Sequence, residues 1–558
     1  VEEVVPSPLR AGLRALRGLP REERLRRLTP IAIDLIRNLY AESNPDLVEA
    51  LPASQEEIQR EVERLLIQEG FQPYVHHQET ASPTGGELTA ASGQTTMADM
   101  ATTEATRKQQ AVAAFKADPG LLVLQGAIQH YAWGGFEFIP ALLRIDNGAK
   151  KPHAELWIGA HPSAPSTTSV VDGPLTLKEL MDGAAEELLG PEAAAQFHRQ
   201  LPYLFKVLDV RTMLSIQAHP SKERAEEAFN DPDLRAKHPD YKDTNHKPEV
   251  HVALTDFWML HDFRPVEEIR GVLDEVPEFA SLKPHFEPGE LKGLYQHLLT
   301  LPQAEVDRLL SPLVDRLTVL KPTDKDQPEF WVVRAAEDRT LHPGVEIKDG
   351  KITADPGHLS VGLFSIYLLN LIHLKPGQGT YQPAGVLHAY LEGRNMELMA
   401  NSDNVIRAGL TYKNVDQKEL LQIGVFEGGK PEILNGEPVS ETETVYRTPA
   451  EEFELSRIEV TENQPHASGT DHSADSLIVL KGNVRVTAGD QTKTLERGAI
   501  FLAPAGVSYL IHTDSATPAV LYKAGVPLPD QQTLEERSGR AQERQAGERT
   551  VWSGKMSP

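Results

Sequence analysis

Two stretches share one pattern: Gly377-Gln-Gly-Thr-Tyr-Gln-Pro383-Ala-Gly385-Val-Leu-His388 and Gly498-Ala-Ile-Phe-Leu-Ala-Pro504-Ala-Gly506-Val-Ser-Tyr509. In both copies five residues separate a glycine from a proline, and the turn reads Pro-Ala-Gly-Val. A glycine, a strand and a Pro-x-Gly turn allow a jelly-roll barrel to reverse direction. Because the flanking apolar alternation also agrees, we favour a true repeat over a chance match and predict two jelly-roll barrels.

The two copies differ at the residue three positions past the turn, which can point into the barrel. The first copy has His388 there and the second has Tyr509. Only the first barrel could therefore hold a metal through this position. We expect the second barrel to be structural.

The remaining chain adds helices around the barrels. Residues 265–339 have leucines at helical spacing, which indicates a helical insertion between stretches of strand-like alternation. We predict a mainly β fold with two jelly-roll barrels, an α-helical subdomain and an N-terminal helical extension. The expected segments are the helical extension (1–77), a flexible Thr/Ser/Ala/Gly-rich linker (78–110), the metal-bearing barrel (111–264 and 346–430), the helical insertion (265–345), the second barrel (431–530) and a polar tail (531–558).

Composition excludes several classes of function. The chain of 558 residues has 40% hydrophobic and 25% charged residues, as in soluble globular proteins, and no apolar run long enough to span a membrane. A net charge of -25 disfavours nucleic acid and anionic lipid as partners. With no cysteine, any metal site must use histidine, carboxylate or amide ligands, and a reducing cytoplasm is the expected location. Because the chain begins at Val1 and not at Met, we expect a processed or incomplete N-terminus.

Four side chains form a candidate metal site. The stretch Ser215-Ile-Gln-Ala-His-Pro220 places Gln217 and His219 two residues apart, which on a strand puts both on one face. Glu249 comes from a second motif, and His388 comes from the barrel turn. Two imidazoles, one carboxylate and one amide suit zinc or a similar first-row ion, and a single negative ligand leaves the site able to act as a Lewis acid.

Several motifs in the same order resemble those of type I mannose-6-phosphate isomerases, also called phosphomannose isomerases. The resemblance runs from about Gln125 to Val526, and Leu387 and Tyr412 stand where many members have proline. The motifs are Ile128-Gln-His-Tyr-Ala-Trp-Gly134, Ala154-Glu-Leu-Trp-Ile-Gly-Ala-His161, Leu201 to Leu208, Ser215 to Pro220, Asn245 to Glu249, and Glu397 to Lys413. The family consists of zinc-dependent cupins that interconvert mannose 6-phosphate and fructose 6-phosphate. The resemblance implies one zinc per chain, held by Gln217, His219, Glu249 and His388, and a catalytic arginine at Arg407.

Aldose-ketose isomerisation needs a base to move a proton between two carbons and an electrophile to stabilise the enediolate, a role that the metal can take. Because a guanidinium stays protonated, Arg407 is expected to stabilise charge; the alternative is a structural ion pair with Asp403. The matched motifs offer three candidates for the base: Glu397, His246 and Lys247. The candidates for binding the phosphate dianion are Lys206, Ser215, Lys247 and Lys413. The sequence does not choose among them.

Two other functions stay open: a cupin isomerase for another sugar phosphate, and a metal-bearing cupin that binds sugars without turnover. A full metal set together with Arg407 disfavours the second, since a binding protein has little need for an open Lewis acid. The N-terminal extension has no counterpart in the family. It is either a helical module that docks an unknown partner or a solubilising remnant, and we favour the remnant.

Overall fold

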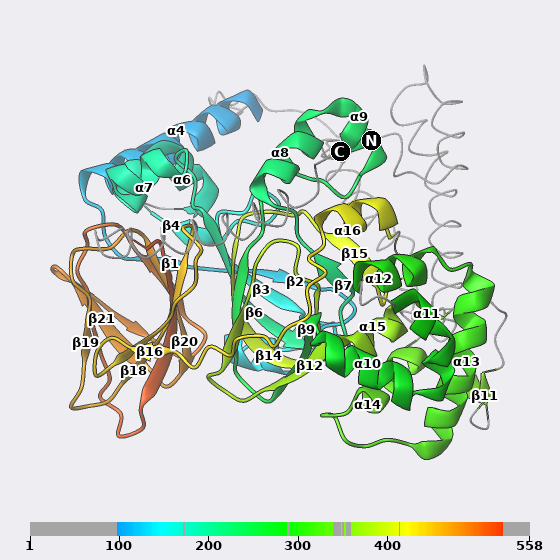
Figure 1. Cartoon of the computed structure of the whole chain (residues 1–558). Helices are drawn as coiled ribbons and strands as arrows, with labels where there is room; N and C mark the ends of the chain where they lie inside the picture. Colours follow the sequence, from blue (N-terminus) through cyan, green and yellow to red (C-terminus); the bar gives the residue numbers. More distant parts are fainter. Residues whose placement is uncertain are drawn as a thin grey trace, which may run out of the picture. The chain divides into compact units, whose positions relative to one another are not determined.

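The ten-stranded sheet that carries the candidate metal site is assembled from both parts of the predicted first barrel (Figure 1). Its strands are β2 (Ala127–Gln129), β3 (Glu155–Gly159), β6 (Tyr203–Val210), β7 (Ile216–Ala218), β8 (Glu249–Ala253), β9 (Phe257–Phe263), β12 (Leu369–Leu374), β13 (Gly379–Gln382), β14 (His388–Ala400) and β15 (Ile406–Gly409). The long strand β14 joins the two parts, because its first residues pair with β7 and β9 and its later residues pair with β6 and β8.

This computed structural model describes residues 97–527, except 171–172, 287–290, 339–346, 349–350, 353–358, 412 and 414. All described residues belong to the second of two compact units, Thr95–Pro558. The predicted helical extension (1–77), the first part of the predicted linker (78–96) and the polar tail (531–558) lie outside the described residues. Among the described residues, no helix has the length and apolarity needed to cross a bilayer.

The C-terminal part forms two further sheets, which face each other across an apolar core containing Ile458, Leu477 and Phe501. The seven-stranded sheet has the order β1 (Leu122–Leu124), β23 (Ile500–Ala503), β20 (Asp475–Lys481), β25 (Ala519–Gly525), β18 (Glu454–Val460), β17 (Glu443–Tyr446), β16 (Glu437–Pro438). The four-stranded sheet has the order β19 (His466–Ala467), β24 (Leu510–His512), β21 (Val484–Ala488), β22 (Gln491–Leu495).

Strand β1 corrects one predicted boundary. Residues 111–264 were expected to belong to the first barrel, but Leu122 and Leu124 pair with Leu502 and Ile500 of β23. Both leucines are buried in an apolar cluster shared by the ten-stranded and seven-stranded sheets. Burial in this shared core therefore draws the strand across to the C-terminal sheet.

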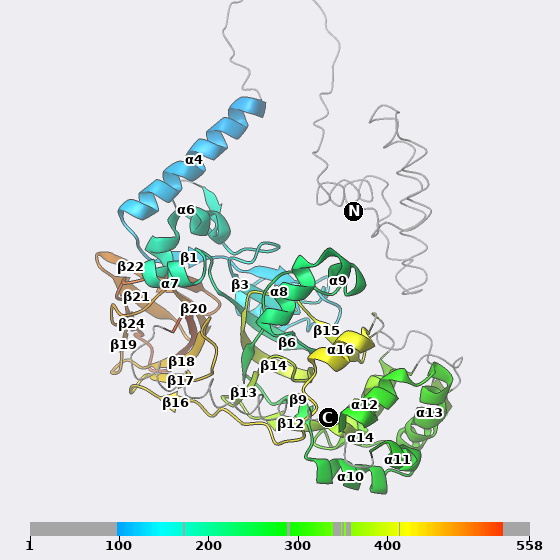
Figure 2. The same cartoon turned by 45° about the horizontal axis from the view of Figure 1, so that its top comes forward.

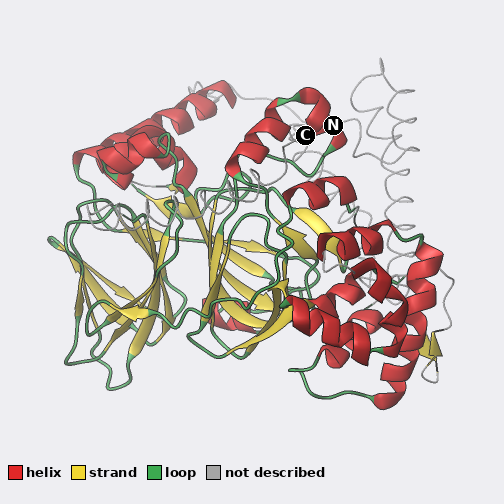
Figure 3. Cartoon of the chain, viewed as in Figure 1, coloured by secondary structure: helices red, strands yellow, loops and turns green. Residues whose placement is uncertain are grey.

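The helical insertion is present and packs around its own core, which Figure 3 shows as a group of red helices at one end of the sheets. Its helices are α10 (Val266–Glu275), α11 (Lys283–Phe286), α12 (Leu291–Thr300), α13 (Gln303–Leu320) and α14 (Pro328–Glu337), with a 3-10 helix at Pro277–Leu282. The remaining helices are α5 (Phe138–Leu143), α6 (Leu177–Leu189), α7 (Pro191–Gln196), α8 (Lys222–Asn230), α9 (Pro232–Lys237), α15 (Gly362–Leu368) and α16 (Gln417–Ile423). Two short hairpins complete the described elements: β4 (Thr167–Ser169) with β5 (Pro174–Thr176), and β10 (Ile347–Lys348) with β11 (Lys351–Ile352).

Helix α4 (Met97–Ala117) occupies residues that we predicted to be flexible linker up to residue 110. In Figure 2 it lies beside α6, and Lys108 pairs with Glu179 of α6 at 2.6 Å. Ala111 and Phe115 are buried against the same region. The prediction was wrong for this part because tertiary packing, and not local periodicity, stabilises the helix.

The predicted repeat is confirmed at the level of the backbone. Gly377 and Gly385 have φ of 89° and 80°, and the matching Gly498 and Gly506 have φ of 87° and 73°. Such values favour glycine because side chains with a Cβ rarely adopt them. The intervening strands β13 and β23 also occupy matching positions.

Candidate metal centre

Three buried side chains converge in the ten-stranded sheet. His219 follows β7, Glu249 begins β8 and His388 begins β14, and one ligand atom from each lies within 4.8 Å of the others. Their exposed fractions are 0%, 2% and 1%. Glu249 lies between the imidazoles, with its carboxylate oxygens 3.4 Å from Nε2 of His219 and 3.3 Å from Nε2 of His388.

Both imidazoles are oriented to offer Nε2 to a cation. Nδ1 of His219 donates to the carbonyl oxygen of Asn404 at 2.8 Å, and Nδ1 of His388 donates to that of Val386 at 3.0 Å. Within the described residues, neither Nε2 atom has a hydrogen-bond partner although both are buried. Burial, followed by the positive charge of Lys247, lowers the pKa of His219 to about 4. Neutral imidazoles with a free Nε2 lone pair are what a metal requires.

The carboxylate of Glu249 is kept ionised by a lysine. Burial alone raises the pKa of a carboxyl group, but Lys247 lies 3.1 Å from Oε1 and, with the two imidazoles, holds the pKa of Glu249 well below its ordinary value. The donor set is therefore two imidazole nitrogens and one anionic oxygen, which fits zinc.

Gln217 stands in register beside this group. Its Cα partner on β14 is His388, and its partner on β15 is Arg407. Directly opposed residues of antiparallel strands face the same side of a sheet, so Gln217, His388 and Arg407 lie in one row. The amide is half-buried, and this register is the structural support for Gln217 as a fourth ligand.

A second row of side chains, several of them titratable, lies beside His219, Glu249 and His388, which together are called the metal group. Strand register aligns Trp157, Lys206 and Glu397 across β3, β6 and β14. Nζ of Lys206 lies 3.0 Å from Oε1 of Glu397 and 3.6 Å from Oε2 of Glu155. Tyr390 donates to Oε2 of Glu397 at 2.7 Å. The row is a buried ion-pair network next to the metal group.

The pKa values of Glu397 and Lys206 in this network are both raised, for different reasons. Burial raises the pKa of Glu397, and the carboxylates of Glu249 and Glu155 add to the effect while Lys206 opposes it. Burial works to lower the pKa of Lys206, but the carboxylates of Glu155 and Glu397 outweigh it and the pKa is raised. Glu397 is thus a carboxylate of increased basicity held beside an ammonium that stays charged.

Arg407 does not form the ion pair that we considered as its structural alternative. Its Nη1 lies 3.2 Å from Oδ1 of Asp240, whereas Asp403 faces Nε2 of His161 at 3.5 Å. Partial burial and the positive charge of Arg407 lower the pKa of Lys413, and the carboxylate of Asp240 opposes the shift. Arg407, Asp240 and Lys413 are thus interacting charges beside the row of Gln217 and His388.

The other predicted residues lie at the edge of the group. Nε2 of His246 lies 2.5 Å from Oε1 of Glu452, and Glu452 belongs to the C-terminal part of the chain. Ser215 is half-buried immediately before β7. Sequence reasoning missed Glu155 and Tyr390 as members of the site. Tyr390 lies two residues from the predicted ligand His388 on the same strand face, and Glu155 stands in the quoted motif Ala154 to His161.

Comparisons with known proteins agree with this geometry. A family model for the phosphomannose isomerase type I catalytic domain matches residues 121–266. The mannose-6-phosphate isomerase of Rattus norvegicus is 34% identical over 445 residues, covering 74% of this chain and 97% of its own length. That of Escherichia coli (strain K12) is 34% identical over 386 residues, covering 67% of this chain and 92% of its own length.

Solved structures give the same result. The mannose 6-phosphate isomerase from Salmonella typhimurium bound to substrate (F6P) and zinc superposes with a TM-score of 0.64 and 30% identity. The match covers 73% of this chain and 100% of that chain. The superposable fold, the buried group of His219, Glu249 and His388, and the relatives matched over nearly their full length all indicate one family. The chain belongs to the type I phosphomannose isomerases.

Proposed function

We propose that the protein interconverts D-mannose 6-phosphate and D-fructose 6-phosphate through an enediolate, with one zinc per chain. The observation that carries the proposal is the pair of buried imidazoles with free Nε2 atoms on either side of the ionised Glu249. The relative from Salmonella typhimurium that binds zinc and F6P supports the assignment of metal and substrate. Absence of cysteine from the sequence supports a cytoplasmic location.

His219, Glu249, His388 and Gln217 would hold the zinc. The set provides two neutral nitrogens, one carboxylate and one amide oxygen, which leaves a net positive centre. When bound, the metal supplies Lewis-acid stabilisation for the oxyanion of the enediolate. The chain itself lowers the pKa of His219, and through Lys247 it keeps the carboxylate of Glu249 ionised.

Glu397 is the group best suited to move the proton between C1 and C2. Its raised pKa brings its basicity closer to neutral pH, and Lys206 and Tyr390 fix its two oxygens. His246 is less suited because Glu452 occupies its Nε2, and Lys247 is committed to Glu249. We therefore favour Glu397 among the three candidates.

Arg407 would stabilise negative charge on the reacting part of the sugar. It lies in register beside Gln217, and Asp240 restrains its partly buried guanidinium. Lys413, close to Arg407, and Ser215, at the start of β7, are then the better placed phosphate ligands. Lys206 is less suited to bind the phosphate, since two carboxylates already surround its ammonium.

We also infer that the sheets form two jelly-roll barrels. The matched positive-φ glycines and the matched strands β13 and β23 support this architecture. It places the proposed chemistry in the first barrel alone.

The decisive experiment combines elemental analysis of the purified protein with a coupled assay on mannose 6-phosphate. We expect one zinc per chain and turnover that disappears on chelation and returns with zinc. A panel of hexose phosphates separates this activity from that of an isomerase for another sugar. Binding of mannose 6-phosphate without turnover in zinc-loaded protein would show that the chain is a binding protein and not an enzyme.

A further inference from the structure

The orientation of the metal-binding His219 depends on a backbone carbonyl far away in the sequence. Nδ1 of His219 donates to the oxygen of Asn404, 185 residues further along the chain, at 2.8 Å. This bond fixes the tautomer, because it places the proton on Nδ1 and leaves the lone pair on Nε2. If the carbonyl moved, the imidazole would lose the partner that directs Nε2 towards Glu249.

The side chain of Asn404 holds that carbonyl in place. Its exposed fraction is 0%. Its Oδ1 accepts from the backbone nitrogens of Lys242 at 2.6 Å and Asp243 at 3.2 Å. Its Nδ2 donates to the backbone oxygens of Asp243 at 2.9 Å and Asn245 at 2.8 Å. One buried amide thus joins the segment before β15 to the segment before β8.

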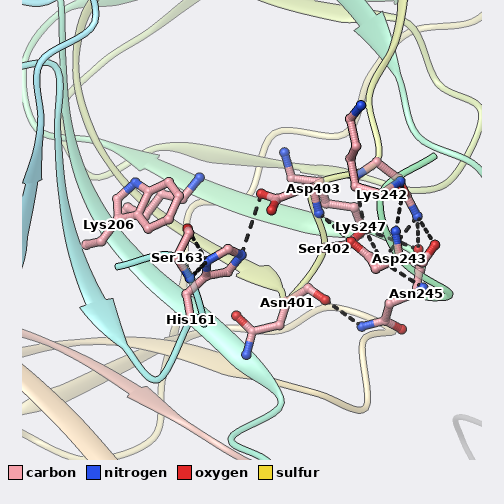
Figure 4. Close-up of polar contacts among 12 residues, drawn as sticks. His161, Ser163, Lys206, Lys242, Asp243, Asn245, Lys247, Asn401, Ser402 and Asp403 are labelled. Atoms are coloured by element: carbon pink, nitrogen blue, oxygen red, sulfur yellow. Dashed lines mark hydrogen bonds and ion pairs between the residues drawn. The ribbon is translucent and has the colours of Figure 1, made fainter. Parts of the chain in front are cut away.

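Asp243 makes the same connection from the opposite side (Figure 4). Its Oδ1 accepts from the hydroxyl of Ser402 at 2.9 Å, and its Oδ2 accepts from the backbone nitrogen of Asp403 at 2.8 Å. Ser402 in turn accepts from the backbone nitrogen of Asn404 at 3.1 Å. Residues 242–245 and 402–404 are therefore cross-linked by hydrogen bonds that pass directly between the two segments.

This network lies beside the functional residues without containing any of them. Segment 242–245 is followed by Lys247 and Glu249, and segment 402–404 is followed by Arg407. A displacement of either segment would shift a ligand or its neighbour by a comparable amount. Hydrogen bonds from a buried amide are directional, and losing one leaves its partners unsatisfied, so the network favours one arrangement.

We propose that Asn404 is a positioning residue of the metal centre: its buried amide clamps segments 242–245 and 402–404 so that its own carbonyl fixes His219 for metal binding. The proposal rests on the proposed zinc function. It extends that function to a residue that contacts neither metal nor substrate.

The test measures zinc affinity of Asn404→Ala by competition with a chelator, independently of activity. Loss of such an outer contact typically weakens metal binding by about 10- to 100-fold, and we expect a change in that range. Asn147→Ala is the matched control, because Asn147 makes the same kind of bonds: Oδ1 accepts from the nitrogen of Lys151, and Nδ2 donates to the oxygens of Phe136 and Lys151. The control should lose some thermal stability and keep wild-type zinc affinity.

Unchanged zinc affinity in folded Asn404→Ala overturns the proposal, even if the protein unfolds at lower temperature, because a purely structural role changes only stability. If Asn404→Ala does not fold, Ser402→Ala provides the second variant, since it removes one member of the network. It should weaken zinc binding in the same direction by a smaller factor, and wild-type affinity there also overturns the proposal. Suppose that Asn404→Ala weakens zinc binding, but the zinc-loaded wild-type protein does not turn over mannose 6-phosphate. That result would refute the isomerase function and leave the positioning role of Asn404 intact.

Discussion

The metal centre and the C-terminal sheets use the same backbone framework to hold different side chains. In the first, the turn glycine Gly385 donates its N–H to the carbonyl oxygen of His219 at 2.8 Å. In the second, the matching Gly506 donates to the carbonyl oxygen of His472 at 3.3 Å. His472 therefore occupies the position that His219 has in the metal centre.

Strand register extends the match to the other two positions. Gln382 of β13 is opposite Glu249, and the matching Ala503 of β23 is opposite Asp475. The repeat itself aligns Tyr509 with the third ligand. The C-terminal counterpart of the metal group is thus His472, Asp475 and Tyr509, and its two rings are 5.8 Å apart compared with 5.1 Å in the metal centre.

The chemistry of the two groups is different. Both ring nitrogens of His472 face backbone carbonyls, those of Ser473 at 2.6 Å and Val507 at 3.1 Å. The hydroxyl of Tyr509 donates to Asp475 at 2.9 Å. The metal centre leaves two lone pairs free for a cation, whereas the C-terminal group satisfies its acceptors with the protein's own N–H and O–H groups.

The C-terminal group also has a cation of its own. Lys523 lies 2.6 Å from Glu443, and although burial works to lower the pKa of Lys523, the carboxylates of Asp475 and Glu443 raise it. A buried carboxylate needs a positive partner, and the two regions obtain it differently. In the metal centre the positive partner would be the bound metal ion, and in the C-terminal group it is the ammonium of Lys523.

The largest expected effect separates the two regions directly. Removal of zinc should abolish turnover, and elemental analysis of reloaded protein should give one zinc per chain, because among the described residues only the first region brings two unpartnered imidazole nitrogens to one carboxylate. The fold should survive chelation, since the metal lies on a large preformed core. Two zinc ions per chain, or full activity in metal-stripped protein, would break the comparison.

Arg407→Lys should lower kcat by roughly 100- to 1000-fold, about 3 to 4 kcal/mol, because a lysine point charge cannot reproduce a planar guanidinium aimed at growing charge. Zinc content should not change. Arg485→Lys is the control, since Arg485 pairs with Asp514 at an exposed position of the C-terminal sheets. Steady-state kinetics of both variants provides the measurement. A steep rise in KM with kcat preserved would mean that Arg407 contributes binding alone.

Lys523→Met should cost about 3 kcal/mol of unfolding free energy, because Glu443 and Asp475 would stay buried without their cation. Catalysis and zinc affinity should be unaffected, since Lys523 belongs to the region without metal. Lys481→Met, an exposed lysine of the same sheet, should change the unfolding free energy by less than about 0.5 kcal/mol. Denaturant unfolding measures both variants, and equal stability of the two would contradict the role given to Lys523.

Asp262 shows how the pKa of a partly buried carboxylate shifts when burial is the largest influence on it. Burial raises its pKa from 3.8 to about 6, and the carboxylate of Glu427 adds to the shift. Since the folded protein binds this proton more tightly than the unfolded chain, the associated stability is full below about pH 4 and is lost as the pH rises through 6.

Asp262→Asn removes this pH-dependent loss. The variant should be more stable than wild type by about 1–2 kcal/mol at pH 7.5, a value reduced for partial solvent exposure. The advantage should vanish at pH 4, and asparagine also suits the positive φ of 57° at this position. Thermal unfolding at both pH values gives the result, and a gain that is equal at pH 4 and 7.5 would point to the backbone alone.

The residues of the metal group could be predicted from the sequence, but the residues that contact and support the predicted site could not. His219, Glu249 and His388 were predictable because each stands in a short motif whose strand and turn could be recognised locally. Gln217, Arg407 and the base stay predictions. Asp240 beside Arg407 and Glu452 beside His246 could not be predicted, since they come from 167 and 206 residues away in the chain. Local patterns carry no information about such long-range pairs.

The same limit explains the errors in the fold. Strand β1 was assigned to the wrong sheet because Leu122–Leu124 reads as a strand equally well in either. Residues 97–110 have a composition typical of linkers, and only packing of Phe115 and its neighbours reveals a helix. Tertiary contact overrode local propensity in α4, whereas in β1 it decided between two sheets that propensity does not distinguish.

The smallest expected effect concerns the N-terminal residues. If the two regions of the comparison are complete in themselves, deleting residues 1–96 should leave kcat, KM and zinc content within about twofold of wild type, because a Ser/Thr-rich linker transmits little force. The cut must fall before Met97, since α4 contributes the buried Ala111 and Phe115 and the Lys108–Glu179 ion pair.

A longer deletion, of residues 1–117, is the matched comparison and should lower the unfolding temperature by exposing the apolar face under α4. Kinetics and thermal unfolding of both truncations, purified in parallel, separate the outcomes. A large fall in kcat in the folded shorter truncation would give the N-terminal residues a regulatory role and favour the docking module over the remnant.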